Sequence, residues 1–505
     1  MDSKAVMGAN EPDNALKSTM SITSDGKGAT IVTKEDGEIL TIDPKAERSL
    51  VWKLDIRLLP LLALMYLFNS LDKTNLGNAK TAGLEADLGM KGTNKYNIIL
   101  SVFYIPYVLG APFIAILGKY YGPSRVLPCM MVTFGTMTLL VVTVKNFGGI
   151  LVLRIILGLA ESAFFPLVIY YQTMFYRRLE LARRLAIFYA ASNIAGAFGG
   201  LLAYGVFHIH GGALQNWRYL FLIEGSLSII MAVIAYIFLP RSVMTASFLN
   251  EEEKKLAFYR IQVDSSAVVD EKFNLRQAAK ILAHPTSWVI LLIEICLGIP
   301  LQSVSLFLPQ IIARLGYSTV KTNLYTVAPN VTGAMMLLIL AFASDFTKWR
   351  FPFIAAGFFF SFCGFVIYSA IDVKHSLHIA YFATFMMCWG TSAPSVLLDV
   401  WYNNNIPDEN RRVFLTSIGV PLANVMGIVA SNIFRPQDAP QYIPALATTA
   451  TFGAVGIVLT LGLGFYMIFD NRRRDRRQGV KLRPQDVPTE RLRDGPNCSE
   501  FRWMY

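Results

Sequence analysis

The chain has 505 residues, of which 54% are hydrophobic and 16% are charged, and its formal net charge is +11. A soluble domain usually has about 25% charged residues, so this composition argues against a soluble globular protein. The positive charge lies at the ends of hydrophobic runs and not on an aromatic-interleaved surface, which excludes a nucleic-acid partner.

The first part of the chain is polar and is followed by six hydrophobic segments. Residues 1–54 are rich in Ser, Thr, Asp, Lys and Gly, and we expect a disordered cytoplasmic tail there. Residues 55–240 should form a bundle of six spans, since each segment has about the 20 residues that cross a hydrocarbon core. These segments lie at roughly 56–76, 97–118, 126–144, 149–172, 184–207 and 217–239.

The second part repeats this arrangement after a polar connector. Residues 241–285 should form a cytoplasmic central loop that is partly helical, and residues 471–505 a cytoplasmic tail. Residues 286–470 contain six more hydrophobic segments, at roughly 287–311, 323–343, 351–371, 379–401, 412–433 and 446–469.

This pattern of six, linker and six predicts an all-α membrane protein with twelve transmembrane helices in two six-helix bundles. Transporters built from two such halves hold their substrate near mid-membrane, between the halves. We expect a small-molecule substrate, a lipid bilayer around a monomer, and no cofactor.

The orientation depends on the charges that flank the spans. The short loops on the two sides hold nearly equal numbers of Lys and Arg, so they do not decide it. The cluster from Arg472 to Arg477, with Lys53 and Arg57 before the first span, favours two cytoplasmic termini. We expect the plasma membrane, and the vacuolar membrane remains an alternative.

Ionisable side chains inside the spans are the candidate functional groups, because each costs about 2.5–3.5 kcal/mol near the bilayer centre. Arg154 and Glu161 are seven residues apart, nearly two helical turns, so they face the same side about 10 Å apart along the axis. Asp72 or a substrate carboxylate can sit between them. The alternative is a polar pair that only orients helices.

The end of the first span carries a second charged pair. Asp72 and Lys73 are neighbours in a helix and point about 100° apart, so they cannot both face one partner. One could hold a substrate anion while the other contacts the fourth span. Asn69 and Asn75, on either side of them, are added as candidate substrate ligands. The alternative is a helix end where the lysine reaches toward the interface.

Two further carboxylates are weaker candidates, and Glu294 is weaker still. Glu224 in the sixth span and Asp399 near the inner end of the tenth span could serve the site or be satisfied by a neighbouring group. The sequence contains no nucleophile motif, metal-ligand cluster or phosphate-binding loop, so we predict no catalytic residue, no metal and no enzyme.

Several stretches resemble a known family. The runs from Leu71 to Lys80, from Trp217 to Gly225 and from Phe434 to Tyr442 are similar to the fungal allantoate-permease branch of the major facilitator superfamily, within the anion:cation symporters. The resemblance covers about residues 50–470. It implies proton-coupled symport of a small organic carboxylate, such as allantoate or nicotinate, by alternating access.

The resemblance also implies roles for the charged residues. Lys73 would attract the substrate carboxylate, Asp72 and Glu161 would bind and release protons, and Arg154 would set their affinity. The family commonly has a Glu and an Asn in the second span, where this chain has Gly110 to Ile114 and lacks both groups.

A gate on the cytoplasmic side is expected from two further motifs. Asp345 and Arg350 lie in a segment that resembles a degenerate cytoplasmic-gate motif, and Arg125 ends a Gly-Pro-Ser-Arg stretch that the family shares. An ordinary charged loop is the alternative. For the whole protein, export of an anionic secondary metabolite or a non-transporting nutrient sensor are the other functions left open.

Overall fold

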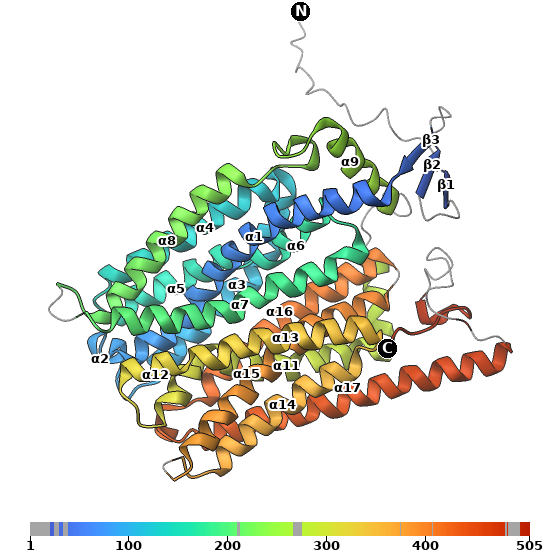
Figure 1. Ribbon diagram of the computed structural model, residues 1–505. Coiled ribbons are helices and arrows are strands. Elements are labelled where there is room, and N and C mark those ends of the chain that lie inside the picture. The colour runs from blue at the N-terminus through green and yellow to red at the C-terminus, as the bar shows by residue number, and fades with distance from the viewer. Residues whose placement is uncertain are drawn as a thin grey trace, which may run out of the picture.

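The computed structural model describes residues 21–24, 30–33, 39–209, 213–265, 275–373, 375–406, 408–479, 482 and 495–505 (Figure 1). Within these residues the membrane-spanning body is all-helical and crosses the membrane several times.

The N-terminal bundle contains six spans, one of which is interrupted. The fourth span is a pair of helices separated by a turn at Ser162 and Ala163. The helices are α1 (Pro44–Thr81), α3 (Lys95–Tyr121), α4 (Pro123–Leu140), α5 (Phe147–Glu161) with α6 (Phe164–Thr173), α7 (Arg178–Val206) and α8 (Asn216–Phe238), with the short α2 (Leu84–Asp87) between α1 and α3.

The C-terminal bundle repeats this count, and its second span is also a pair of helices. The helices are α11 (Pro285–Ala313), α12 (Thr319–Tyr325) with α13 (Val327–Thr347), α14 (Phe351–Ala370), α15 (Leu377–Asn404), α16 (Glu409–Ile433) and α17 (Ile443–Gln478).

Ten of the spans in the described part of the chain have the length and apolar composition to cross a membrane on their own. The other two, α1 and α15, carry more polar side chains and pack against the ten: α1 lies against α7 and α8, and α15 against α13 and α14. The predicted twelve-span, two-bundle fold is therefore confirmed.

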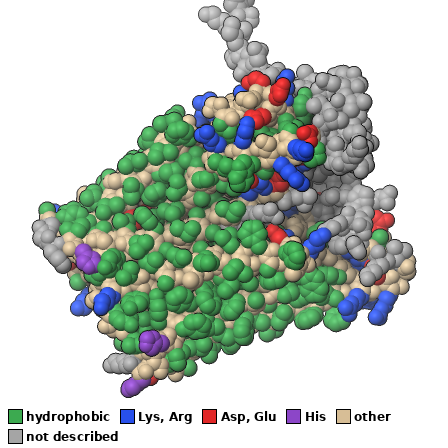
Figure 2. Space-filling view, viewed as in Figure 1, with side chains coloured by type: hydrophobic (Ala, Val, Ile, Leu, Met, Phe, Trp, Pro, Cys, Tyr) green, Lys and Arg blue, Asp and Glu red, His purple; other side chains and the backbone are tan. Residues whose placement is uncertain are grey.

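The flank of the molecule is apolar. Figure 2 shows hydrophobic side chains covering the visible flank, with charged side chains gathered toward the two ends. Large side chains such as Phe113 (74% exposed) and Val458 (70% exposed) point outward. An exposed apolar surface of this extent is the surface that a bilayer covers.

The start of α1, the C-terminal residue Tyr505 and α9 (Glu251–Ser265) lie on one side of the membrane-spanning body, here called the terminal face (Figure 1). The side with α2 and α12 is called the opposite face. Arg260 of α9 is fully buried and pairs with Glu47 of α1 and Glu180 of α7. The central segment is therefore fastened to the N-terminal bundle. It also contains α10 (Leu275–Ala278) and two 3-10 turns, Val243–Thr245 and Ala279–Ala283.

The N-terminal tail differs from the expectation of disorder up to residue 54. Three short strands form an antiparallel sheet, and α1 begins at Pro44. The physical reason is local: the Asp43 side chain caps the helix by accepting from Lys45 N at 3.0 Å, and proline suits the first helical position. The strands are β1 (Ser21–Ser24), β2 (Thr30–Thr33) and β3 (Ile39–Ile42). Residues 1–20 lie outside the described residues.

The last span also continues past its expected end at residue 470. α17 runs to Gln478 and stops at Gly479, whose φ of 68° is the left-handed conformation that commonly ends a helix. The arginine-rich start of the predicted tail is therefore helical.

Candidate functional site

The predicted lysine of the first span contacts the predicted glutamate of the fourth. Lys73 Nζ lies 3.6 Å from Glu161 Oε2. The Lys73 side chain is 21% exposed, whereas that of Glu161 is fully buried. Lys73 Nζ also lies 4.5 Å from the ring centroid of Tyr107 on α3, a distance at which a cation is attracted to the ring. The ammonium group is thus held between a carboxylate and an aromatic face.

Glu161 sits where the fourth span is interrupted. It is the last residue of α5, and the turn at Ser162 and Ala163 follows. Neither of its carboxylate oxygens has a hydrogen-bond partner, and the buried amide nitrogen of Asn69 also lacks one. An unsatisfied buried carboxylate is costly, so this position suits a group that gains a proton or a ligand during a functional cycle.

Asp72 points in a different direction from Lys73. Thr138 Oγ1 on α4 donates to Asp72 Oδ1 at 2.9 Å, while Asp72 Oδ2 has no partner. Lys73 is therefore the residue of this pair that contacts the fourth span, and Asp72 faces the third.

Arg154 is 4% exposed and lies within electrostatic reach of both Asp72 and Glu161. Its Nε has no hydrogen-bond partner. Between Arg154 and Glu161, Gly158 packs on the backbone of α3: a Cβ at this position would lie 2.3 Å from the carbonyl oxygen of Phe103. The small residue lets α3 approach α5 and brings Tyr107 to Lys73.

Glu224 of α8 joins the same group of charges. It is 1% exposed, lies within electrostatic reach of Asp72 and Arg154, and neither of its carboxylate oxygens has a partner. We call Asp72, Lys73, Arg154, Glu161 and Glu224 the N-bundle cluster. Four of the five are buried inside the protein, and Lys73 is partly exposed.

Asn75, a predicted substrate ligand, lies apart from this cluster. Its Oδ1 accepts from Asn78 Nδ2 at 3.0 Å and faces Gly199 of α7, where a Cβ would lie 2.8 Å away. Asn75 therefore packs α1 against α7. Asn69 is the predicted asparagine that lies beside Glu161.

The C-terminal bundle reaches the N-bundle cluster through α3. Tyr104, between Phe103 and Tyr107, donates from its hydroxyl to Gln302 Oε1 of α11 at 2.7 Å. Toward the opposite face, Ser101 Oγ lies 2.7 Å from Ser431 Oγ of α16. Still further along, Asn97 Nδ2 donates to the carbonyl of Phe434 at 3.0 Å. These contacts hold the two bundles together on the side of the opposite face.

A second polar seam joins α7 to α15. Ser392 Oγ donates to Asn193 Oδ1 at 2.8 Å, and Ser395 Oγ donates to the Tyr189 hydroxyl at 3.3 Å. Polar side chains thus line the interface between the bundles, where a substrate of a two-bundle carrier binds.

Asp399 belongs to a separate acidic group in the C-terminal bundle. The Tyr402 hydroxyl donates to Asp399 Oδ1 at 2.6 Å, and the carboxyl of Glu294 contacts that of Asp399. Glu294 is 2% exposed, and its Oε1, which has no partner, faces Gly419 of α16. Asp399 is therefore not part of the N-bundle cluster.

Of the three predicted gate residues, the structure brings two together. Arg350 Nη2 lies 3.0 Å from Asp345 Oδ1 at the terminal face. Arg125 is exposed in the first turn of α4 and forms no ion pair with the described residues.

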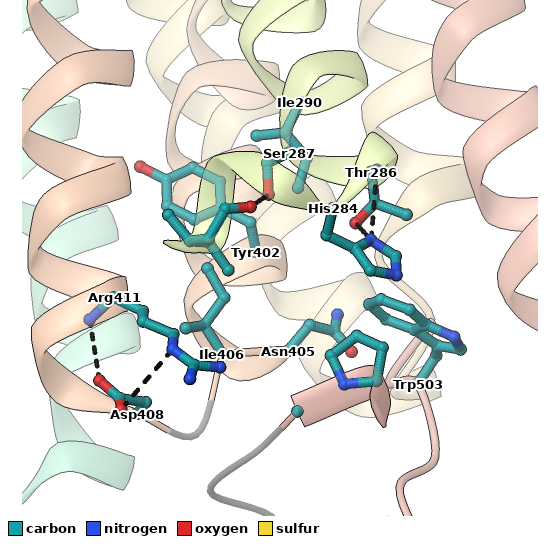
Figure 3. Close-up of a pocket in the computed structure, with 13 residues that line it drawn as sticks. His284, Thr286, Ser287, Ile290, Tyr402, Asn405, Ile406, Asp408, Arg411 and Trp503 are labelled. Atoms are coloured by element: carbon teal, nitrogen blue, oxygen red, sulfur yellow. Dashed lines mark hydrogen bonds and ion pairs between the residues drawn. The ribbon is translucent and has the colours of Figure 1, made fainter. Parts of the chain in front are cut away.

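Sequence reasoning missed a docked C-terminal segment, residues 501–505. Asn405 exchanges two hydrogen bonds with the backbone of Met504, and Asn471 exchanges two with that of Trp503. Figure 3 shows the cavity that this segment helps to enclose, between His284 at the start of α11 and Tyr402 on α15. The aromatic residues Phe501, Trp503 and Tyr505 at the chain end were the sequence feature that could have indicated this docking.

Comparison with known proteins places this geometry in a family. A family model described as Major Facilitator Superfamily matches residues 62–431. An uncharacterized transporter of Schizosaccharomyces pombe is 52% identical, over 99% of this chain and 98% of the relative. A high-affinity nicotinic acid transporter of Saccharomyces cerevisiae is 29% identical, over 94% of this chain and 88% of the relative.

Solved structures share the fold. The partially occluded, inward-open xylose transporter XylE of E. coli superposes with a TM-score of 0.63 at 12% identity, covering 81% of this chain and 98% of that one. An inward-facing bacterial homologue of the lysosomal transporter Spinster gives 0.60 at 14% identity, covering 80% and 96%.

Proposed function

We propose that this chain, which belongs to the major facilitator superfamily and is a secondary transporter rather than an enzyme, carries a small organic carboxylate together with a proton. Within the superfamily we assign it to the anion:cation symporters, in the allantoate-permease branch. The similarity to a nicotinic acid transporter supports a carboxylate substrate. We place the protein as a monomer in the plasma membrane, with the terminal face in the cytoplasm.

The contact between Lys73 and Glu161 is the observation that carries this proposal. Lys73 is the partly exposed cation of the pair, so an incoming carboxylate can reach it. If the substrate draws Lys73 away, Glu161 keeps a buried, uncompensated charge unless it takes up a proton. Proton and anion then cross together, which keeps the net charge of the load near zero.

The remaining charges of the N-bundle cluster support the pair. Arg154 sets the proton affinity of Asp72 and Glu161 through its electrostatic interaction with both, and Asp72 is a second proton-binding group. Asn69 adds an amide donor beside Glu161. We propose that Asp345 and Arg350 act as a gate at the terminal face.

The contacts between α3 and α16 near the opposite face suggest the state of the transport cycle. We infer that the structure represents a conformation closed at the opposite face, so that the substrate exchanges with the terminal face.

Uptake into proteoliposomes with an imposed pH gradient tests the proposal. Labelled nicotinate and allantoate are the first two substrates of a wider carboxylate panel. Glu161→Gln should abolish pH-driven accumulation yet keep exchange of labelled for unlabelled substrate, because the neutral amide mimics the protonated acid. Lys73→Ala should lose substrate binding. The exposed Glu252→Gln is the matched control. Full accumulation by Glu161→Gln, or wild-type affinity of Lys73→Ala, would reject the assigned roles.

A further inference from the structure

Four arginines share one side of α17 beyond the membrane-spanning part. Arg472, Arg473, Arg476 and Arg477 line a shallow hollow together with Phe469. Residues three to four positions apart lie on the same side of a helix, so this spacing gathers the four side chains. All four are exposed, and within the described chain no carboxylate pairs with any of them.

The acidic residues of this helix segment are occupied on its other side. Asp470 Oδ2 accepts from Arg474 Nε at 2.7 Å and from Trp503 Nε1 at 2.8 Å. Asp475 Oδ1 accepts from Arg502 Nε at 2.7 Å. Arg474 of α17 therefore neutralises Asp470, Arg502 of the docked C-terminal segment neutralises Asp475, and the outer side of α17 is left uniformly cationic.

The cationic side continues directly from the lipid-facing surface. Phe465 is 51% exposed and lies two turns before the arginines, and Phe469 is 63% exposed and lies one turn before them. One turn of helix rises about 5.4 Å, so the surface changes from apolar to cationic over the depth at which hydrocarbon gives way to headgroups. Figure 2 shows Lys and Arg side chains gathered at this end of the molecule.

Guanidinium groups suit the phosphates found at that depth. The planar fork of arginine donates two parallel hydrogen bonds to phosphate oxygens, and four such groups without an acid among them favour a ligand with net negative charge. A zwitterionic headgroup has no net charge because its cation offsets the phosphate, whereas an anionic headgroup keeps a net negative charge.

We propose that residues 469–477 on the outer side of α17 form a binding site for the headgroup of an anionic phospholipid in the leaflet at the terminal face. The arginines contact the phosphate and the second anionic group, and an acyl chain lies along Phe469 and Phe465. The site is independent of the substrate and of proton coupling.

Lipid titration of the purified full-length chain in detergent, followed by native mass spectrometry, tests the site. The probes are phosphatidylserine, phosphatidylcholine with the same acyl chains, and soluble glycerophosphoserine. We expect phosphatidylserine to bind more tightly than the other two. Replacing all four arginines with Gln should weaken its binding, by about fivefold for each arginine. Replacing all four with Lys should retain most of the binding.

A charge-matched variant separates a site from a general effect of net charge. The exposed lysines Lys119, Lys255, Lys280 and Lys348, replaced together by Gln, remove the same charge elsewhere on the terminal face. An equal loss of phosphatidylserine binding in this variant would overturn the proposal. Equal binding of phosphatidylcholine would also overturn it, and so would equal binding of glycerophosphoserine, which would indicate a soluble anion. Gel filtration verifies that each variant is folded. If the variant with four Gln residues is not folded, the comparison of phosphatidylserine with the other two probes on the wild type and on the variant with four Lys residues still tests the proposal.

Discussion

Lys73 Nζ lies 3.6 Å from Glu161 Oε2, and this contact joins the C-terminal third of α1 to the interruption between α5 and α6. Glu161 is fully buried, and neither of its oxygens accepts a hydrogen bond. Its charge is therefore compensated mainly by the ammonium group of Lys73. Lys73 retains some exposure, and in the proposed function this partly exposed ammonium links anion binding to the protonation of Glu161.

This dependence predicts a stability effect that is separate from transport. Lys73→Ala leaves a buried carboxylate without its cation, and we expect the free energy of unfolding to fall by about 3 kcal/mol. This value is at the lower end of the range for breaking a buried ion pair, because Lys73 is partly exposed. Thermal unfolding in detergent measures the loss. In the double variant Lys73→Ala/Glu161→Gln, most of the lost stability should be recovered, because the buried carboxylate is absent.

The control for that series is a lysine–glutamate pair at the surface. Lys254 Nζ lies 2.8 Å from Glu251 Oε1, and the Glu251 side chain is 77% exposed. Lys254→Ala should cost less than about 1 kcal/mol. If Lys73→Ala destabilised the protein as little as Lys254→Ala, Glu161 would not depend on Lys73 to compensate its charge.

A second prediction concerns the threonine that holds Asp72. Thr138→Val keeps the shape of the side chain but removes the hydroxyl that donates to Asp72 Oδ1, so that neither carboxylate oxygen has a hydrogen-bond partner. We expect a destabilisation of about 1–3 kcal/mol, measured by thermal unfolding. Thr133, one turn or so earlier on α4, is exposed and bonds only to the carbonyl of Cys129. Thr133→Val should change stability by less than about 0.5 kcal/mol, and equal effects at both positions would argue against a special role for Thr138.

A third prediction tests how the bundles close. A Cβ at Gly427 of α16 would lie 2.2 Å from the ring of Tyr104 on α3, so this close approach requires glycine. Gly427→Ala should push α16 away from α3 and lower the population closed at the opposite face. Spin labels on the two bundles at that face should report longer distances.

Gly462→Ala is the matched control, because nothing lies within 4 Å of a Cβ at that position. It should leave the distance distribution unchanged. An unchanged distribution in Gly427→Ala would show that the Tyr104 ring can move without separating the bundles.

The sequence predicts the spans well because their signal is local. A run of apolar residues of sufficient length forms a helix in a bilayer regardless of its neighbours, and all twelve were expected close to where they lie. The helix ends were harder to predict: α1 begins at Pro44 because a cap and a proline act before the apolar run starts, and α17 extends to Gln478 because arginines are good helix formers.

Contacts between helices could be predicted only in part. The different directions of Asp72 and Lys73 follow from helix geometry alone. The partners Thr138 and Tyr107 do not, because they depend on how α4 and α3 are rotated and shifted against α1. The same reason explains why Asn75, adjacent in sequence to the cluster, faces Gly199 instead.

A last prediction concerns pH and the cavity beneath the C-terminal segment. His284 caps α11: its Nδ1 accepts from Thr286 N at 3.4 Å, and its ring centroid lies 5.9 Å from that of Trp503 (Figure 3). Burial lowers the pKa of His284, and Arg474 lowers it further, while Asp470 opposes the shift. The folded state therefore favours the neutral imidazole, whose Nδ1 can accept.

The sign of the pH effect follows from this lowered pKa. The unfolded histidine titrates near pH 6.5, so the contribution of His284 to stability is fully present above that pH and is lost as the pH falls through it toward the folded pKa. Protonated Nδ1 cannot accept from Thr286 N, so acidification should loosen the start of α11 and its contact with Trp503.

Hydrogen exchange of residues 495–505, corrected for intrinsic rates, should be faster at about pH 5.5 than at about pH 7.5. His284→Gln should remove this difference, whereas His375→Gln, at an 84% exposed side chain, should keep it. Exchange that is equally pH-dependent in His284→Gln would assign the effect to another group.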